Sequence, residues 1–220
     1  MTELNTISHI IALTMGVAWA SGINLYAAIL MLGLLGSTGN ITLPQDLLIL
    51  TNPMVIFAAG AMYLVEFVAD KIPGVDTGWD ALHTFIRIPA GALLAANAVG
   101  NVNPAVALAA GILGGGLAAG SHTFKAGIRG LINTSPEPFT NWTASVLEDL
   151  TVVAGLWMAL HYPWLFIGLL VMFILLMIWL LPKIWRGIKK AFIALRRLAG
   201  TKPVLEKGLM HGKNGRSEHI

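Results

Sequence analysis

Residues 163–182 read PWLFIGLLVMFILLMIWLLP and contain no charged side chain. A helix that crosses a bilayer needs about 20 consecutive apolar residues, so this stretch indicates a membrane protein. It belongs to one of three longer charge-free stretches, which cover residues 4–45, 88–124 and 150–182. We therefore expect an all-α, polytopic membrane helix bundle.

The composition of the whole chain agrees with this expectation. Of the 220 residues, 56% are hydrophobic and 11% are charged, whereas soluble domains carry roughly 25% charged residues. So little charge cannot cover a soluble surface, which argues against soluble enzymes, nucleic-acid binders and disordered regulators. The chain has no cysteine, which excludes disulfides, thiolate metal sites and cysteine nucleophiles.

Turn-forming residues divide the apolar stretches at TNP (51–53), GNVNP (100–104) and HYP (161–163). We predict six transmembrane helices, at about 8–36, 50–69, 79–99, 104–130, 142–160 and 162–185. The first is long and has SGIN (21–24) at its middle. These residues indicate either a tilted helix with small packing residues or a broken helix, and we favour the tilted helix.

The basic residues predict the orientation. Ten of the fourteen Lys and Arg lie between Lys183 and Arg216, and cytoplasmic segments are enriched in both residues. Six spans would then place both termini in the cytoplasm, as expected for a multi-pass protein of the bacterial cytoplasmic (inner) membrane. The loops placed outside, 37–49, 100–103 and 161–163, contain no Lys or Arg.

Three regions follow from this pattern. Residues 1–182 form the transmembrane bundle, 183–199 a basic amphipathic interfacial helix, and 200–220 a disordered cytoplasmic tail. Such a basic helix favours anionic lipid, although it could serve only to anchor the topology. The partners that we expect are the lipid bilayer, anionic lipid and a possible homo-oligomer, with no nucleic acid and no cofactor.

Two loops share a pattern that suggests an internal repeat. PGVDTGW (73–79) and PEPFTNW (136–142) agree as Pro-x-x-x-Thr-x-Trp. The shift of 63 residues would superpose the second and third helices on the fourth and fifth, as a tandem repeat of hairpins. The alternative is two unrelated hairpins with similar residues at the membrane interface.

Ionisable residues follow helical spacing near the cytoplasmic ends of four helices. Residues three, four or seven apart share one helix face, and charges at membrane depth are costly and usually functional. We therefore expect one polar cavity, open to the cytoplasm, that is lined by Glu66, Asp70, Asp80, His83, Arg87, Lys125, Arg129, Glu148 and Asp149. The alternative is a structural ion network that ties the helices together.

Specific roles can be predicted within this group. Arg87 is expected to pair with Glu148 or Asp149, and Glu66 with Lys125 or Arg129. The planar guanidinium of Arg87 suits an anion such as carboxylate or phosphate. We predict no metal site, because the histidines lack the spacing of a metal-binding helix, and we assign no catalytic residue.

The helix at 104–130 is rich in glycine. Gly111 and Gly115, and also Gly116 and Gly120, form Gly-x-x-x-Gly pairs, which let helix backbones approach closely. We expect these glycines to pack at the centre of the monomer. A dimer interface and a sliding surface are the alternatives.

Two segments carry a family resemblance. SGINLYA (21–27) and EFVADKIPGVDTGWD (66–80) resemble the bacterial membrane family catalogued as domain of unknown function 4126, and the resemblance covers roughly residues 8–180. It implies a membrane protein and supplies no activity and no catalytic residue.

Three functions are then compatible with the residues. The first is a small transporter or channel for an ion, a small polar solute or a lipid headgroup. The second is a non-transporting scaffold or assembly protein whose buried charges are structural. The third, a membrane-embedded enzyme, is disfavoured because the sequence has no nucleophile motif and no metal motif.

Overall fold

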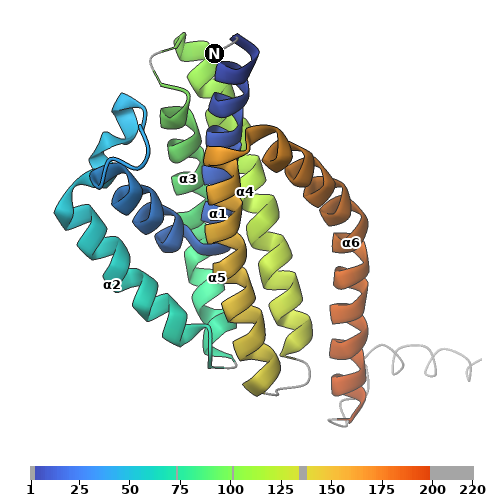
Figure 1. The fold of residues 1–220 in the computed structure, drawn as a ribbon. Helices are drawn as coiled ribbons and strands as arrows, with labels where there is room; N and C mark the ends of the chain where they lie inside the picture. The colour runs from blue at the N-terminus through green and yellow to red at the C-terminus, as the bar shows by residue number, and fades with distance from the viewer. Residues whose placement is uncertain (1–2, 73, 101, 134–137, 199–220) are drawn as a thin grey trace, which may run out of the picture.

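The computed structural model describes residues 3–72, 74–100, 102–133 and 138–198, which form an all-helical bundle without strands in these ranges (Figure 1). Its elements are the helices α1 (Glu3–Ser37), α2 (Pro53–Ala69), α3 (Val75–Ala98), α4 (Pro104–Ile132), α5 (Pro138–His161) and α6 (Pro163–Leu198), and the 3-10 helix η1 (Gln45–Thr51). An all-α bundle is therefore confirmed.

Asn-Pro pairs begin two of the helices. In α2 the side chain of Asn52 accepts a hydrogen bond from the amide of Met54, and Pro53 is the first helical residue. In α4 Asn103 caps the helix in the same way and is followed by Pro104. Proline suits this position because its missing N–H would have no partner within the helix.

The long first helix is broken at its middle. Asn24 has the extended backbone angles φ −145° and ψ 97°, and its side-chain oxygen accepts a hydrogen bond from the amide of Ala27 at 2.9 Å. Asn24 thus caps a second half-helix. Our preference for a tilted, unbroken helix was wrong, because the Asn24 side chain satisfies an amide that the break exposes.

The two halves of α1 return to the same end of the bundle (Figure 1). His9 and Leu13 from the first half line the same 510 Å³ cavity as Asn40 and Pro44, which follow the second half. A straight helix would separate these segments by roughly 40 Å. The helix α1 is therefore re-entrant: it enters the bundle, turns at Asn24 and leaves on the side where it began.

The other helices run from end to end. The cavity at the end of the bundle with His9 is also lined by Ala98 and His161, where α3 and α5 end. At the opposite end the indole N–H of Trp142 donates to the Lys71 carbonyl at 3.1 Å. We call this second end the basic end, because α6 carries its lysines and arginines there, and the first the far end.

This geometry corrects the predicted topology. The chain begins at the far end, whereas α6 reaches the basic end, where Ile184 lies beside Gly127 near the end of α4. The helix at 8–36 is therefore no full span, and the two ends of the described chain lie at opposite ends of the bundle. The cytoplasmic placement of both termini stays a prediction, because residues 1–2 and 199–220 lie outside the described residues.

Several helices could span a membrane. By length and apolar character alone these are α1, α4, Phe139–His161 of α5 and Pro163–Lys190 of α6, and η1 with α2 forms a further pair bent by 66°. Of these, α1 does not cross the bundle, because it turns back at Asn24. The helix α3 carries more charge, but its charges face inward. Asp80 and Arg87 are buried, whereas Leu82, Phe85 and Leu93 are exposed, as expected for a helix whose outer face meets lipid.

The most extensive helix contact is that of α3 with α4, and glycines such as Gly91 and Gly114 allow the two helices to approach. A Cβ on Gly114 would collide with the Ala95 side chain of α3. A Cβ on Gly115 would lie 3.2 Å from that of Ala92. Packing of Gly115 inside the monomer is therefore confirmed, although Gly114 makes the tighter contact.

The remaining predicted glycines differ from one another. A Cβ on Gly111 would meet the Ala92 carbonyl at 3.4 Å, and one on Gly120 would meet the Met177 side chain of α6 at 2.8 Å. A Cβ on Gly116 would meet no described atom within 4 Å. The predicted packing role of Gly116 was therefore wrong, because this residue lies on the exposed side of α4.

The helix α6 leans away from the bundle and then continues through Leu198 (Figure 1). The basic segment predicted as an amphipathic helix over 183–199 is, as far as residue 198, the last part of α6. Its position on a membrane surface stays a prediction, as does the hairpin repeat. Residues 73 and 136 of the repeat pattern, residue 199 and the tail 200–220 lie outside the described residues.

Candidate functional site

A charge network lies between α2, α3, α4 and α5, in the half of the bundle nearer the basic end. It comprises Arg87, Lys125 and Arg129 together with the carboxylates of Glu66, Asp70, Asp76, Asp80 and Glu148, all linked by N–O distances of 4.0 Å or less. Glu148 has 16% of its side chain exposed, and the other members have at most 3%.

Arg87 is fully buried and lies between two acids. One terminal nitrogen lies 2.5 Å from Glu66 Oε1, and the other lies 3.0 Å from Asp80 Oδ1. The predicted pairing of Arg87 with Glu148 or Asp149 was wrong. Asp80 lies two turns earlier on the same face of α3, and Glu66 projects from α2. These two acids, and not the acids of α5, therefore contact the guanidinium. Both terminal nitrogens of Arg87 therefore already contact carboxylates, and only its buried Nε has no hydrogen-bond partner among the described residues.

Lys125 lies at the centre of the network. Its ammonium donates to the backbone carbonyl of Ile23 at 3.1 Å. Four carboxylates surround the same nitrogen: Asp70 at 3.0 Å, Glu66 and Glu148 at 3.4 Å, and Asp80 at 3.7 Å. The predicted pairing of Glu66 with Lys125 is confirmed.

Arg129 joins α4 to α5. It binds Glu148 through two parallel contacts, Nε to Oε1 at 3.0 Å and Nη2 to Oε2 at 2.8 Å. Its other terminal nitrogen donates to the Asp70 carbonyl at 2.8 Å and to Asn141 Oδ1 at 2.6 Å. This forked geometry is the strongest form of an arginine–carboxylate pair.

Asp149 lies beside the network and pairs with neutral donors. The Asn24 amide donates to Oδ1 at 2.9 Å, and the Tyr63 hydroxyl donates to Oδ2 at 3.1 Å. No Lys or Arg of the described chain lies within ion-pair distance of it. An acid at membrane depth that forms no ion pair is costly when ionised, so Asp149 is suited to exchange a proton.

Histidines flank the network on α3 and α4. His83 stacks on Trp79, and its Nε2 lies 3.1 Å from the Tyr26 hydroxyl. His122 Nδ1 lies 3.3 Å from Arg87 Nη1, and His122 Nε2 lies 2.7 Å from the Thr84 hydroxyl. In the parts of the chain that the structure describes, no group of His, Asp and Glu has the arrangement of a metal site.

The break in α1 meets the network at both half-helix ends. Lys125 contacts the Ile23 carbonyl at the end of the first half, and Asp149 contacts Asn24 at the start of the second. Helix carboxyl ends carry partial negative charge and amino ends partial positive charge. Each half-helix end therefore meets a side chain of opposite sign.

Negative charge exceeds positive charge in this region. The network holds five carboxylates and three cations, and Asp149 adds a further acid beside it. Three carboxylate oxygens are buried without a hydrogen-bond partner among the described residues: Glu66 Oε2, Asp70 Oδ1 and Asp80 Oδ2. A proton or a further cation would balance this excess.

The structure thus brings together most of the predicted site. Seven of the nine residues belong to the network, and His83 and Asp149 lie beside it through their own hydrogen bonds. The predicted open polar cavity is replaced by a closed cluster. It is reached from a 280 Å³ pocket that Lys125 and Glu148 line among mostly apolar residues.

Sequence reasoning left out Asp76 of the network and three polar residues beside it. Asn24 forms the break, Tyr63 holds Asp149, and Asn141 supports Arg129. Tyr63 was visible in principle, because it lies three residues before Glu66 on the same helix face. Asn141 had no comparable signal, since it precedes the expected start of its helix.

The comparison with known families agrees with the resemblance in the sequence. A family model described as a domain of unknown function, DUF4126, matches residues 11–183. No curated protein and no solved structure matches the chain. Since the matched segment includes α2 to α5, most of α1 and the apolar part of α6, the chain belongs to the DUF4126 family.

Proposed function

We propose that this protein is a small membrane transporter or channel that moves a proton or a small cation through the charge network. The observation that supports this most is the break in α1, whose two half-helix ends meet Lys125 and Asp149. Transporters commonly form ion sites from the carbonyls and helix ends that such discontinuous helices expose at membrane depth.

The charge balance favours a cation over an anion or an anionic headgroup. The three basic side chains each contact at least two carboxylates. Among the described residues of the network, three buried carboxylate oxygens have no hydrogen-bond partner, against one buried nitrogen of the cations, Arg87 Nε. An anion would have to displace an acid from Arg87 or Arg129. A proton or cation would instead reduce the excess negative charge.

The orientation follows from the distribution of Lys and Arg. We place the basic end on the cytoplasmic side of a bacterial inner membrane, in line with the enrichment of both residues in cytoplasmic segments. The 510 Å³ cavity with His9 and Asn40 would then open to the other side. The last part of α6 would contact anionic lipid, and two chains could associate.

Flux through reconstituted protein tests this function. Liposomes that contain the protein and an internal pH dye should dissipate an imposed proton gradient faster than protein-free liposomes, or dissipate a Na⁺ or K⁺ gradient. Asp149→Asn should lower the flux at least tenfold, because an amide cannot carry the proton and cannot balance a cation. Asp46→Asn, at an exposed position in η1, is the matched control.

Two outcomes would contradict the proposal. One is wild-type flux no greater than that of empty liposomes for each of the three cations. The other is an Asp149→Asn variant that is folded and as active as the wild type.

A structural scaffold is the second candidate function. Its support is the closure of the network: among its cations, Arg87 and Arg129 are at most 1% exposed and each contacts two or more acids. If the network only holds the helices together, removing Glu66 along with Arg87 should restore the stability lost with Arg87 alone. Wild-type protein would then produce no flux.

A further inference from the structure

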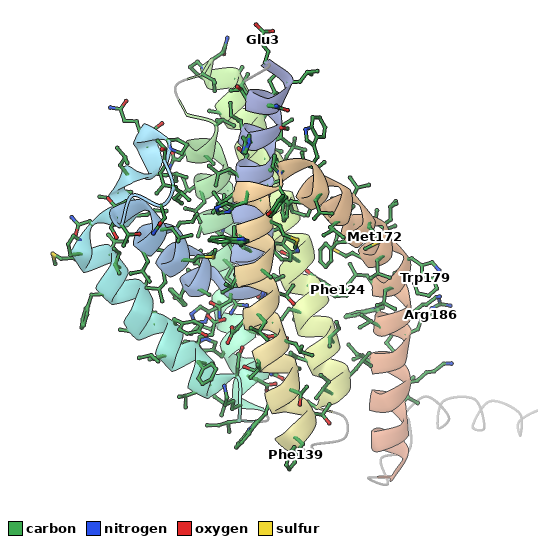
Figure 2. The ribbon with its side chains drawn as sticks, in the orientation of Figure 1. Glu3, Phe124, Phe139, Met172, Trp179 and Arg186 are labelled. Atoms are coloured by element: carbon green, nitrogen blue, oxygen red, sulfur yellow. The ribbon has the colours of Figure 1, made fainter. Side chains whose placement is uncertain are left out.

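The side of the network that faces α6 opens into an aromatic pocket. Its volume is 280 Å³, and its walls include Trp19 of α1, Phe124 of α4 and Phe173 of α6. The rings touch edge to face, with centroid distances of 6.1 Å for Trp19–Phe173 and 5.3 Å for Phe124–Phe173. Figure 2 shows Phe124 on the side of α4 that faces α6.

An apolar cavity continues from this pocket along α5 and α6. It has a volume of 340 Å³, shares Trp19, Thr151 and Phe173 with the aromatic pocket, and extends to Phe166 and Leu170. The two cavities lie between α6 and the helices α1, α4 and α5, because Phe173 of α6 lines both of them. Together they offer an aromatic compartment beside the charges and an alkyl-sized extension leading away from them.

The charged residues that line the aromatic pocket favour a cationic ligand. Glu148 and Lys125 line it, and Glu148 has the greatest side-chain exposure in the network, 16% against at most 3% for the others. The acids of the network also outnumber its cations. A ligand head at this position therefore meets the exposed part of Glu148, whose oxygens also contact Arg129 and Lys125, in a network whose acids outnumber its cations.

The aromatic rings of the pocket also favour a cationic ligand. The faces of Trp and Phe attract cations, and aromatic enclosures bind quaternary ammonium groups in particular. We propose that the aromatic pocket binds a lipophilic organic cation, with its ammonium or other onium head at Glu148 and its apolar group along α6. This inference rests on the proposed function and widens its substrate class from a proton or a small cation to a lipophilic organic cation.

A charge-matched pair of probes tests the proposal. Protein in nanodiscs of zwitterionic lipid would be titrated calorimetrically with octyltrimethylammonium and, separately, with octyl sulfate, which carries the same alkyl chain. Saturable binding of the cation without saturable binding of the anion is the expected result. Equal binding of both probes would show a pocket for lipid tails only and would overturn the proposal, as would binding of neither.

Variants locate the binding in this pocket. Phe124→Ala and Glu148→Gln should each weaken binding of the cation roughly tenfold. Phe85→Ala, at an 82% exposed ring on α3, and Glu3→Gln are the matched controls and should bind as the wild type does. Phe124→Ala leaves every ion pair in place, so it stays informative if Glu148→Gln fails to fold. Unchanged binding in a folded Phe124→Ala variant contradicts the assignment.

The outcomes separate this inference from the proposed function. Binding of the cation without flux of any cation leaves the pocket assigned and contradicts transport. Proton, Na⁺ or K⁺ flux without binding of octyltrimethylammonium contradicts the substrate class and leaves transport standing.

Discussion

The same two helices, α3 and α4, pack in opposite ways in the two halves of the bundle. Toward the far end Ala95 lies against Gly114, and the contact is close because neither has a large side chain. Toward the basic end Arg87 and Lys125 fill the interface instead, each surrounded by carboxylates. One half is therefore held by close approach of backbones, and the other by charge compensation.

The difference predicts how each half responds to mutation. Removing one member of a buried ion pair leaves its partner charged and unpaired, which costs about 3–5 kcal/mol. Adding volume to a close helix contact costs about 1–3 kcal/mol. The charged half should thus be the more sensitive to single substitutions, although an apolar replacement of several charges together could be neutral or stabilising.

The largest effect is expected at Arg87. Arg87→Gln should lower the free energy of unfolding by about 3–5 kcal/mol, because Glu66 and Asp80 would remain buried without their cation. Denaturant unfolding in mixed micelles would measure the loss. Arg186→Gln, at an exposed position of α6, is the control and should show no loss. Equal stability of the two variants would mean that charge compensation does not hold this half together.

A smaller effect is expected in the other half. Gly114→Leu should destabilise the bundle by about 1–3 kcal/mol through overpacking against Ala95. Gly116→Leu should stay within about 0.5 kcal/mol of the wild type, as exposed substitutions usually do. Thermal unfolding of the two variants compares them directly. A larger loss for Gly116→Leu would place that face of α4 in an interface, for example between two copies of the chain.

The smallest effect is expected at the break. Asn24→Ala removes the cap of the second half-helix, which costs about 1 kcal/mol, and it also releases Asp149. Asn40→Ala, exposed at the far end, should change stability little. If transport depends on the break, Asn24→Ala should lose more activity than its stability loss explains, as flux measured below its unfolding temperature would show.

Much of the fold could be predicted from the sequence. The helix expected at 104–130 is observed as Pro104–Ile132, and the one expected at 79–99 as Val75–Ala98. The length of an apolar stretch and an Asn-Pro pair at its start are local features of the sequence. Helices can therefore be predicted from them without knowledge of the tertiary structure. The convergence of Glu66, Arg87 and Lys125 was predictable for the same reason, because helical spacing decides which residues share a face.

The rest depends on the relative rotation of helices, which local spacing does not specify. Arg87 faces Glu66 and Asp80 rather than Glu148 or Asp149, the partners that we expected from the sequence. Gly114 makes the close contact while its neighbour Gly116 faces outward. The break at Asn24 was missed because an apolar helix of this length is long enough to span a bilayer, and only the cap and its partners show the turn.

The central claim is that α1 turns back at Asn24 and leaves the membrane on the side where it entered. The absence of native cysteine allows a direct measurement, in which single cysteines are labelled with a membrane-impermeant maleimide in oriented vesicles. Asn5→Cys and Asn40→Cys, before and after α1, should label from the same side, and Gly78→Cys at the basic end should label from the opposite side. Labelling of Asn5→Cys and Asn40→Cys from opposite sides would show that α1 crosses the membrane and would contradict the account.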